Sequence, residues 1–229
     1  MNSERPQDRD IWAVVPARSV VTGKSRLAPV VSDAARRYLN ATLLRHTVET
    51  VKSAFDADRV LVVSACDEVR QLALQLGVET LRDHQPHGLN AALEQAAAEV
   101  ARRGAKGVLV LPSDLPLLSA SDLELLLCAY QQKRQMVISP NHENSGTNAL
   151  LLAPVAAIPY AFGVGSFLKH VIHARELHLP TKVVRSQGLA LDLDLPEDLA
   201  YWAELIHGAA RYDFSRRVLS DLRARNVCV

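Results

Sequence analysis

The sequence predicts an α/β protein with a mostly parallel central sheet flanked by helices. Short apolar runs alternate along the chain with longer segments in which apolar residues recur at helical spacing, as in β-α-β units. The clearest run, Gly107–Leu111, is almost uniformly apolar and predicts a central strand. In open α/β sheets ligands bind beyond the carboxyl ends of the strands, so we expect the functional residues in the loops that follow them.

The elements can be placed in order from their apolar patterns. The strand-like runs are residues 11–16, 59–64, 78–81, 107–111, 135–140, 146–152 and 181–185. The helical segments are residues 32–54, 67–76, 89–103, 121–133 and 167–177. Ser32 is a suitable N-cap for the first helix, and Gly77 should end the second. A last helical region is expected from Pro196 to about Arg225, interrupted at Gly208.

The composition is that of an ordinary globular protein. The chain has 229 residues, of which 48% are hydrophobic and 22% charged, with a formal net charge of +1. This balance favours neither nucleic acid nor a membrane surface as a partner, and no apolar run approaches the length of a membrane span. Residues 1–10 are polar, which predicts a disordered lead-in, and residues 11–229 are expected to form one domain with a helical extension from about residue 203.

The three cysteines are widely separated along the chain and form neither a zinc motif nor a disulfide framework. A reducing, cytoplasmic location is therefore expected. The amphipathic C-terminal helices make a homodimer a reasonable expectation.

The most informative motif is a pair of aspartates, Asp192 and Asp194, separated by one leucine. On a strand, residues two apart point the same way, so both carboxylates would lie on one side. Such a pair needs a cation between its charges, and Mg²⁺ takes carboxylate ligands together with substrate phosphates. The alternative is a helix start, with Asp194 as N-cap, Pro196 in the first turn and Glu197 and Asp198 at the positive end of the helix.

A third carboxylate follows the central strand. Asp114 lies between two prolines just beyond residues 107–111, where α/β enzymes keep catalytic groups. It is a further candidate ligand for Mg²⁺, and the alternative is a turn aspartate that bonds to its own backbone.

Several loops carry candidate groups for binding phosphates. Arg18, Lys24 and Arg26 form a basic loop after the first strand that would suit a triphosphate. The glycine spacing of a P-loop is absent, and a solvated basic loop is the alternative. Gly88 would let a ligand approach the backbone, and Asn90 could match a nucleobase edge. A plain loop-to-helix junction remains the alternative for these two residues.

A glycine-rich stretch ending at Ser166 precedes the helix at 167–177 and could hold a phosphate or carboxylate with backbone N–H groups. The spacing does not match a dinucleotide-binding motif. From its position shortly before Gly146, we place His142 near the ligand of this part of the chain.

Taken together and in this order, the motifs resemble the nucleotidyltransferases of the molybdenum-cofactor guanylyltransferase type. The residues that carry this resemblance are Lys24–Leu27, Gly88–Leu93, Pro112–Pro116 and Asp192–Leu199. With the addition of Gly146–Leu150 and Phe162–Phe167, residues 11–202 resemble the 2-phospholactate guanylyltransferase (CofC) family.

The resemblance implies a nucleotide-diphospho-sugar transferase fold of the GT-A, Rossmann-like type. It also implies the transfer of GMP from GTP to a phosphorylated three-carbon acid, with release of pyrophosphate, in the biosynthesis of coenzyme F(420). We favour 3-phospho-D-glycerate as the acceptor, because the C-terminal tail and overall pattern look more like the proteobacterial branch of the family. The acceptors 2-phospho-L-lactate and phosphoenolpyruvate remain open. A related transferase that uses another nucleoside triphosphate and a sugar-phosphate or cofactor acceptor is a second alternative. A nucleotide-binding or scaffold protein without activity is a third.

The resemblance also implies roles for individual residues. The Mg²⁺ ligands would be Asp114, Asp192 and Asp194. The acceptor would be bound by Thr147, Gly163 and Ser166. GTP would be bound by Arg18, Lys24, Arg26, Gly88 and Asn90, with Lys24, Arg18 and Asp114 acting in catalysis.

Overall fold

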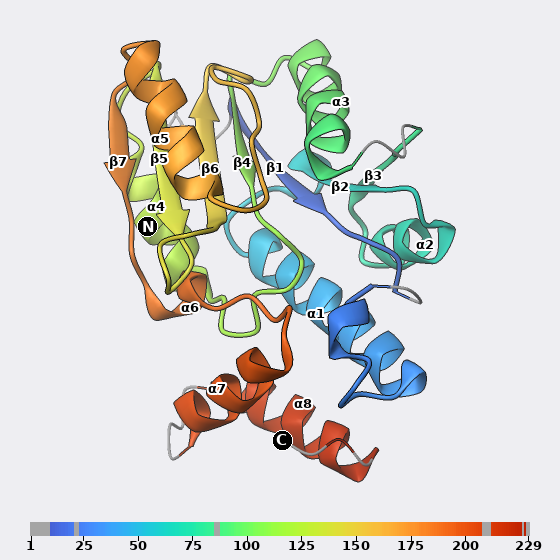
Figure 1. Cartoon of the computed structure of the whole chain (residues 1–229). Coiled ribbons are helices and arrows are strands. Elements are labelled where there is room, and N and C mark those ends of the chain that lie inside the picture. Colours follow the sequence, from blue (N-terminus) through green and yellow to red (C-terminus); the bar gives the residue numbers. More distant parts are fainter. Residues whose placement is uncertain (1–9, 21–22, 85–87, 208–211, 226, 228–229) are drawn as a thin grey trace, which may run out of the picture.

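A computed structural model describes residues 10–20, 23–84, 88–207, 212–225 and 227 of the chain. Among them, seven strands form one sheet in the order β3-β2-β1-β4-β6-β5-β7 (Figure 1). The strands are β1 (Ile11–Pro16), β2 (Val60–Ser64), β3 (Glu79–Arg82), β4 (Gly107–Val110), β5 (Gln135–Pro140), β6 (Thr147–Ala153) and β7 (Thr181–Val183). Only β6, between β4 and β5, runs antiparallel to its neighbours in this part of the chain. The predicted mostly parallel sheet is confirmed.

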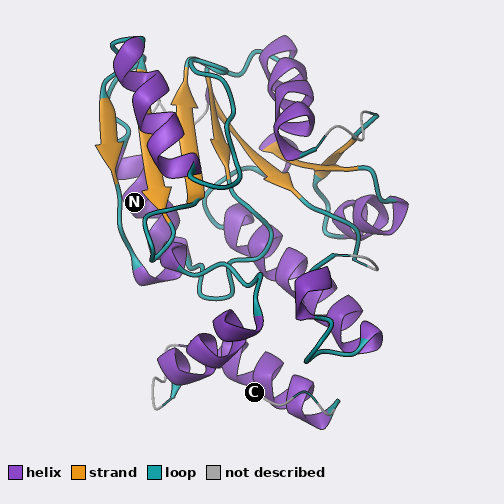
Figure 2. Ribbon diagram, in the orientation of Figure 1, coloured by secondary structure: helices purple, strands orange, loops and turns teal. Residues whose placement is uncertain are grey.

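Helices cover both faces of the sheet (Figure 2). One face carries α1 (Asp33–Lys52), α2 (Asp67–Gln75), α4 (Ala120–Ala129) and the short α6 (Gln187–Ala190). The other carries α3 (Leu89–Arg102) and α5 (Ser166–Glu176). Strand β1 shows why its run is continuously apolar, since Ala13 and Val15 pack on the first face and Trp12 and Val14 on the second.

Local signals set several of the helix ends. The Ser32 side chain accepts a hydrogen bond from the Ala35 N–H and caps α1 as predicted. Gly77, with φ +75°, follows the end of α2 in the left-handed conformation. Helix α4 ends at Ala129, earlier than predicted, because Tyr130 is already extended. Helix α6 was not expected from the sequence.

The predicted C-terminal helical region consists of α7 (Pro196–Ile206) and α8 (Asp213–Ala224). Both lie beyond the carboxyl ends of the strands, beside α1 (Figure 1). The interruption predicted at Gly208 lies outside the described residues, as does the predicted lead-in apart from Asp10. No helix of the described residues is long and apolar enough to span a membrane.

The C-terminal helices share a buried apolar cluster with the loops at the carboxyl edge of the sheet. Trp202 of α7 is fully buried there. The cluster also contains Leu27 after β1, Leu117 after β4, and Leu191 and Leu193 before α7. The tail therefore packs against three loops in which functional residues were predicted.

One buried hydrogen bond ties the tail to the loop after β4. Ser215 of α8 is 1% exposed, and its hydroxyl donates to the Pro116 carbonyl at 2.9 Å. We expect Ser215→Ala to lower the free energy of unfolding by about 1–2 kcal/mol, because it leaves a buried carbonyl without this donor. Urea denaturation would measure the change. Ser53→Ala, which removes an exposed hydroxyl bonded to the Thr50 carbonyl, is the matched control, and an equal loss in both variants would contradict the prediction.

Candidate active site

Three segments meet beyond the carboxyl ends of the strands: the loop after β1, the loop after β4, and the connector that precedes α7. The Leu193 N–H donates to the backbone carbonyl of Asp114 at 3.1 Å. Lys24 joins the same two segments, because its Nζ lies 3.2 Å from Asp114 Oδ2 and also donates to the Leu193 carbonyl. Residues far apart in the sequence are thus held at one point of the sheet edge.

Lys24 is held deeply at this junction. Its side chain is only 7% exposed, against 30% for Asp114, and its backbone takes a left-handed conformation with φ 56°. The residue starts the short 3-10 helix Ser25–Leu27, whose last side chain is buried in the cluster beneath. The ammonium group therefore neutralises Asp114 and fastens the connector, a role that sequence reasoning had not assigned to it.

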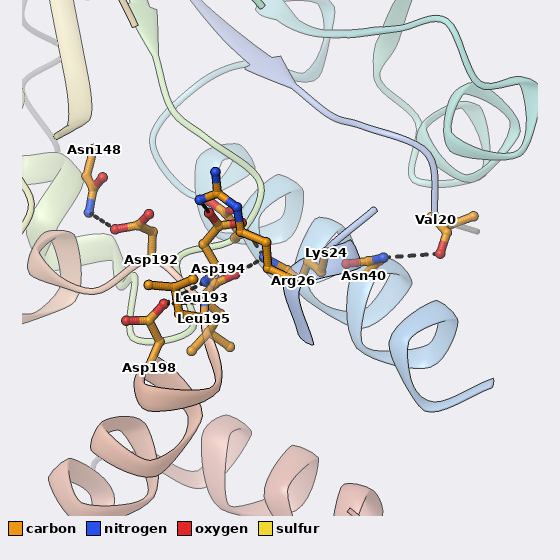
Figure 3. Close-up of polar contacts among 11 residues, drawn as sticks. Val20, Lys24, Arg26, Asn40, Asn148, Asp192, Leu193, Asp194, Leu195 and Asp198 are labelled. Atoms are coloured by element: carbon orange, nitrogen blue, oxygen red, sulfur yellow. Dashed lines mark hydrogen bonds and ion pairs between the residues drawn. The ribbon is translucent and has the colours of Figure 1, made fainter. Parts of the chain in front are cut away.

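Asp192 is held by a buried amide. Asn148 Nδ2 donates to Asp192 Oδ1 at 3.1 Å and to the Leu189 carbonyl at 2.9 Å, and Figure 3 shows the Asp192 carboxylate turned toward Asn148. Burial and, to a smaller extent, the negative charge of Asp114 together raise the pKa of Asp192 to about 6, against the opposing effect of the Asn148 hydrogen bond. Asp114 therefore lies close enough to Asp192 for its negative charge to disfavour the ionised form of Asp192.

A register irregularity in the sheet places the Asn148 amide. Strand β6 pairs Ala149 with Ser139 but Thr147 with Pro140, so the register shifts at Asn148. Asn148 then faces Leu189 and Asp192, while Thr147 turns to the side of α5. β-Bulges of this kind often re-aim side chains beside functional sites.

Asp194 has different partners from Asp192. Its carboxylate pairs with Arg26, with Nη1 to Oδ2 at 2.7 Å, and both side chains are exposed. Asp194 is not the N-cap of α7, which corrects the helix-cap alternative. The N-cap is Leu195, and the Asp198 side chain accepts from the N–H groups of Asp194 and Leu195 (Figure 3).

The predicted strand at Asp192–Asp194 is absent, since the connector forms no strand in the structure. Its alternation nevertheless persists, because Leu191 and Leu193 are buried while both aspartates stay partly exposed. The described residues contain no group of three or more acidic, His or Cys side chains arranged to hold a metal. Asp194 lies against Arg26 in this structure, and its role as a metal ligand beside Asp114 and Asp192 stays a prediction. Asp114 and Asp192 remain as a neighbouring pair whose oxygen donors fit a hard divalent cation.

The predicted acceptor residues surround the start of α5. Thr147 and Ser166 are 5% and 1% exposed, and the Thr147 hydroxyl lies 3.0 Å from His170 Nδ1. Gly163 has φ +117°, which a side chain would disfavour. The Ser166 N–H donates to the Gly163 carbonyl at 3.0 Å, so one of the backbone groups expected to hold an anion is already bonded.

The amide of Asn90 is also bonded within the protein. Its Oδ1 accepts from the Phe162 N–H at 2.8 Å, and its Nδ2 donates to the Phe162 carbonyl at 3.2 Å. Asn90 thus fastens the loop before α5, and each of its two polar groups already has one partner in the protein. Its role in binding a nucleobase stays a prediction. Gly88, with φ +100° and open space where a Cβ would stand, remains accessible to a ligand.

The other two residues predicted from the sequence, Arg18 and His142, are exposed at the protein surface. Arg18 is exposed beyond β1. The His142 N–H donates to the Ala190 carbonyl at 2.7 Å, and its ring lies against Tyr201, with centroids 5.4 Å apart. The residues that sequence reasoning missed are Asn148 and His170. A polar side chain in the apolar run of β6 was the available signal for Asn148, and the sequence offered no clear signal for His170.

A mostly parallel sheet with carboxylates and cations in the loops beyond its carboxyl edge is the arrangement of an α/β enzyme suited to phosphorylated ligands and a divalent cation. The fold agrees with a solved structure from Desulfovibrio desulfuricans, described as a candidate nucleotide-diphospho-sugar transferase, with a TM-score of 0.74 at 14% identity over 94% of this chain and 97% of that one. More particularly, residues 11–226 match the family described as "Guanylyl transferase CofC like". The chain belongs to this guanylyltransferase family.

Relatives in the family carry three different names. A "Phosphoenolpyruvate guanylyltransferase" of Rubrobacter xylanophilus is 41% identical over 83% of this chain and 92% of its own length. A "2-phospho-L-lactate guanylyltransferase" of Methanothermobacter thermautotrophicus is 35% identical over 92% and 90%. A "3-phospho-D-glycerate guanylyltransferase" of Colwellia psychrerythraea is 31% identical over 84% and 90%.

Proposed function

We propose that this protein transfers GMP from GTP to a small phosphorylated carboxylic acid and releases pyrophosphate, as a step in coenzyme F(420) biosynthesis. The observation that carries the proposal is the pair Asp114 and Asp192 at the carboxyl edge of the sheet, held by Lys24 and Asn148, in a chain of the CofC-like family. A reaction that consumes GTP also fits the cytoplasmic location expected from the sequence.

In the proposed reaction, an oxygen of the acceptor phosphate bonds to the α-phosphorus of GTP, and the bond from that phosphorus to the pyrophosphate oxygen breaks. The acceptor phosphate is already an anion at neutral pH, so the chain needs no strong general base. Its residues contribute alignment and charge neutralisation. Arg18 and Arg26 would bind the leaving pyrophosphate, while Lys24 holds Asp114 in place.

Mg²⁺ is part of this proposal. Asp114 and Asp192 would hold the ion, with Asp194 available if it exchanges Arg26 for the metal. When bound, the ion would supply neutralisation of the negative charge of phosphate oxygens. The hydrogen bond from Asn148 fixes the Asp192 carboxylate, and burial, with the negative charge of Asp114, raises the pKa of Asp192.

For the acceptor we propose 3-phospho-D-glycerate, on the sequence pattern and C-terminal tail described above. The main competitor is phosphoenolpyruvate, since the relative of that name is 41% identical while the one named for 3-phospho-D-glycerate is 31% identical.

A direct competition assay tests the acceptor. The protein is incubated with GTP, Mg²⁺ and equal concentrations of 3-phospho-D-glycerate, 2-phospho-L-lactate and phosphoenolpyruvate, and each GMP adduct is measured by mass spectrometry. We expect the adduct of 3-phospho-D-glycerate to form fastest. If either of the other adducts forms faster, the proposed acceptor is wrong but the proposed reaction stands. Turnover with only ATP, CTP or UTP, or with only sugar phosphates, would overturn the proposed function.

A further inference from the structure

His170 of α5 is a fully buried histidine that lies between two parts of the predicted acceptor site. It is 0% exposed. Its Nδ1 lies 3.0 Å from the hydroxyl oxygen of Thr147 at the start of β6, and its Nε2 lies 3.0 Å from the backbone nitrogen of Ala161. One ring thus connects strand β6 with the loop that precedes α5.

The two contacts determine which ring nitrogen carries the proton. A backbone N–H can only donate, so Nε2 of His170 must accept from Ala161 and carries no hydrogen. Nδ1 then carries the proton and donates to the Thr147 oxygen. Burial, together with smaller electrostatic effects of His173 and Lys169, lowers the pKa of His170 to about 4, so the ring is neutral at physiological pH.

This tautomer constrains the hydroxyl of Thr147. Because the oxygen accepts from Nδ1, the hydroxyl proton has to be directed away from the ring. A hydroxyl can ordinarily either donate or accept toward a ligand, but here donation is favoured. A Thr147 hydroxyl that donates its proton suits a negatively charged oxygen of the phosphorylated acid. It disfavours a ligand that presents an N–H or O–H group.

The loop on the other side of the ring is fastened at two successive residues. His170 holds the N–H of Ala161, and Asn90 holds both backbone groups of Phe162. The Phe162 ring also packs edge-on against His170, with centroids 5.0 Å apart. Gly163 follows directly, so the position of this predicted acceptor-binding residue depends on these two contacts.

We propose that His170 is a positioning residue for the acceptor site: it directs the Thr147 hydroxyl as a donor to an anionic oxygen of the acceptor, and it fixes the loop that carries Gly163. The inference rests on the proposed function, because it assumes that the acceptor binds beside Thr147. The interaction is made in the ground state as well as in the transition state, so its loss should raise the KM for the acceptor and leave kcat largely unchanged.

Two substitutions separate the two contacts of the ring. The Nδ2 of asparagine can replace Nδ1 as a donor to Thr147, whereas the Oε1 of glutamine can replace Nε2 as an acceptor from Ala161. We expect His170→Gln to raise the KM for the acceptor by about tenfold, the equivalent of one hydrogen bond, with the KM for GTP within about twofold of the parent. His170→Asn should retain more of the acceptor affinity than His170→Gln. His173→Gln, on the same helix, is the matched control and should leave both KM values unchanged.

A double-mutant cycle with Thr147→Val tests whether the effect passes through the hydroxyl. Once that hydroxyl is removed, His170→Gln should produce no further increase in the KM for the acceptor. Independent, multiplying increases would overturn the proposal, and so would an equal rise in the KM for GTP. Absence of turnover by the parent protein with every phosphoacid would instead refute the proposed function.

The tautomer of His170 can also be measured in the unmodified protein, so the proposal can be tested even if the variants do not fold. Nitrogen-15 NMR of the imidazole groups distinguishes a protonated from an unprotonated ring nitrogen. We expect His170 to be the Nδ1–H tautomer without change between pH 6 and pH 8, as the geometry requires. An Nε2–H tautomer would overturn the inference whatever the activity of the variants.

Discussion

Replacing Lys24 by methionine is expected to reduce the rate of GMP transfer by about 10–100-fold, because Asp114, a proposed Mg²⁺ ligand, would lose the group that holds it in place. It should also lower the free energy of unfolding by about 1–3 kcal/mol. Lys24 is largely buried, contacts Asp114 at 3.2 Å and donates to the Leu193 carbonyl. Without the ammonium, Asp114 loses its ion pair with Lys24, and the connector before α7 loses one attachment. Urea denaturation and a pyrophosphate-release assay measure the two effects.

Arg26→Met is the matched control for the effect on stability. Arg26 lies on the same loop and also pairs with an aspartate, but its side chain and that of Asp194 are 67% and 43% exposed. Exposed pairs contribute about 0–1 kcal/mol, so this variant should unfold at nearly the same urea concentration as the parent. Lys24→Arg should not restore the parent's stability, because a planar guanidinium cannot readily replace a compact ammonium between a carboxylate and a carbonyl. Equal stability of Lys24→Met and the parent would show that the contact with Asp114 is not structural.

The elements of the sheet were predictable because both faces of its strands are buried. In β1, alternate residues pack against different helical layers, which makes a continuous apolar run recognisable in the sequence. The antiparallel direction of β6 was not predictable in this way, since an apolar run carries no direction. Helix α6 has only the residues Gln187–Ala190, too few for a period to be visible.

The site was predictable in its residue types but less so in its contacts. The leucines beside Asp192 and Asp194 are buried as an alternating pattern requires, yet the two carboxylates have different partners. Which cation approaches which aspartate depends on how separate loops meet in space, and one sequence does not contain that information. The same holds for Asn148, whose direction depends on a shift in strand register.

Replacing Asp192 by asparagine is expected to make the protein more stable and much less active. The variant removes a partly buried negative charge beside Asp114, while the new side chain can still accept the hydrogen bond from Asn148 through its oxygen. In the absence of ligands we expect the free energy of unfolding at pH 7 to rise by about 1–3 kcal/mol, from the shift in the Asp192 pKa. The rate of GMP transfer should fall by about 10²–10⁴-fold, because an amide is a poor replacement for a carboxylate that holds a divalent cation.

The pH dependence of stability gives this prediction a definite sign. The pKa of Asp192 in the folded protein is about 6, above the ordinary value of 3.8, so the folded state disfavours the charged form. The resulting loss of stability is absent below the ordinary pKa, grows as the pH rises between these two values, and is complete above the higher one. Urea denaturation of parent and variant at several pH values should therefore show a difference that widens across this window. Asp194→Asn, which removes one partner of an exposed ion pair, is the matched control and should change the free energy of unfolding by no more than about 1 kcal/mol. If Asp192→Asn instead destabilises the protein at pH 7, the prediction is wrong. The Asp192 carboxylate then stabilises the folded protein, and activity is not gained at the expense of stability at this residue.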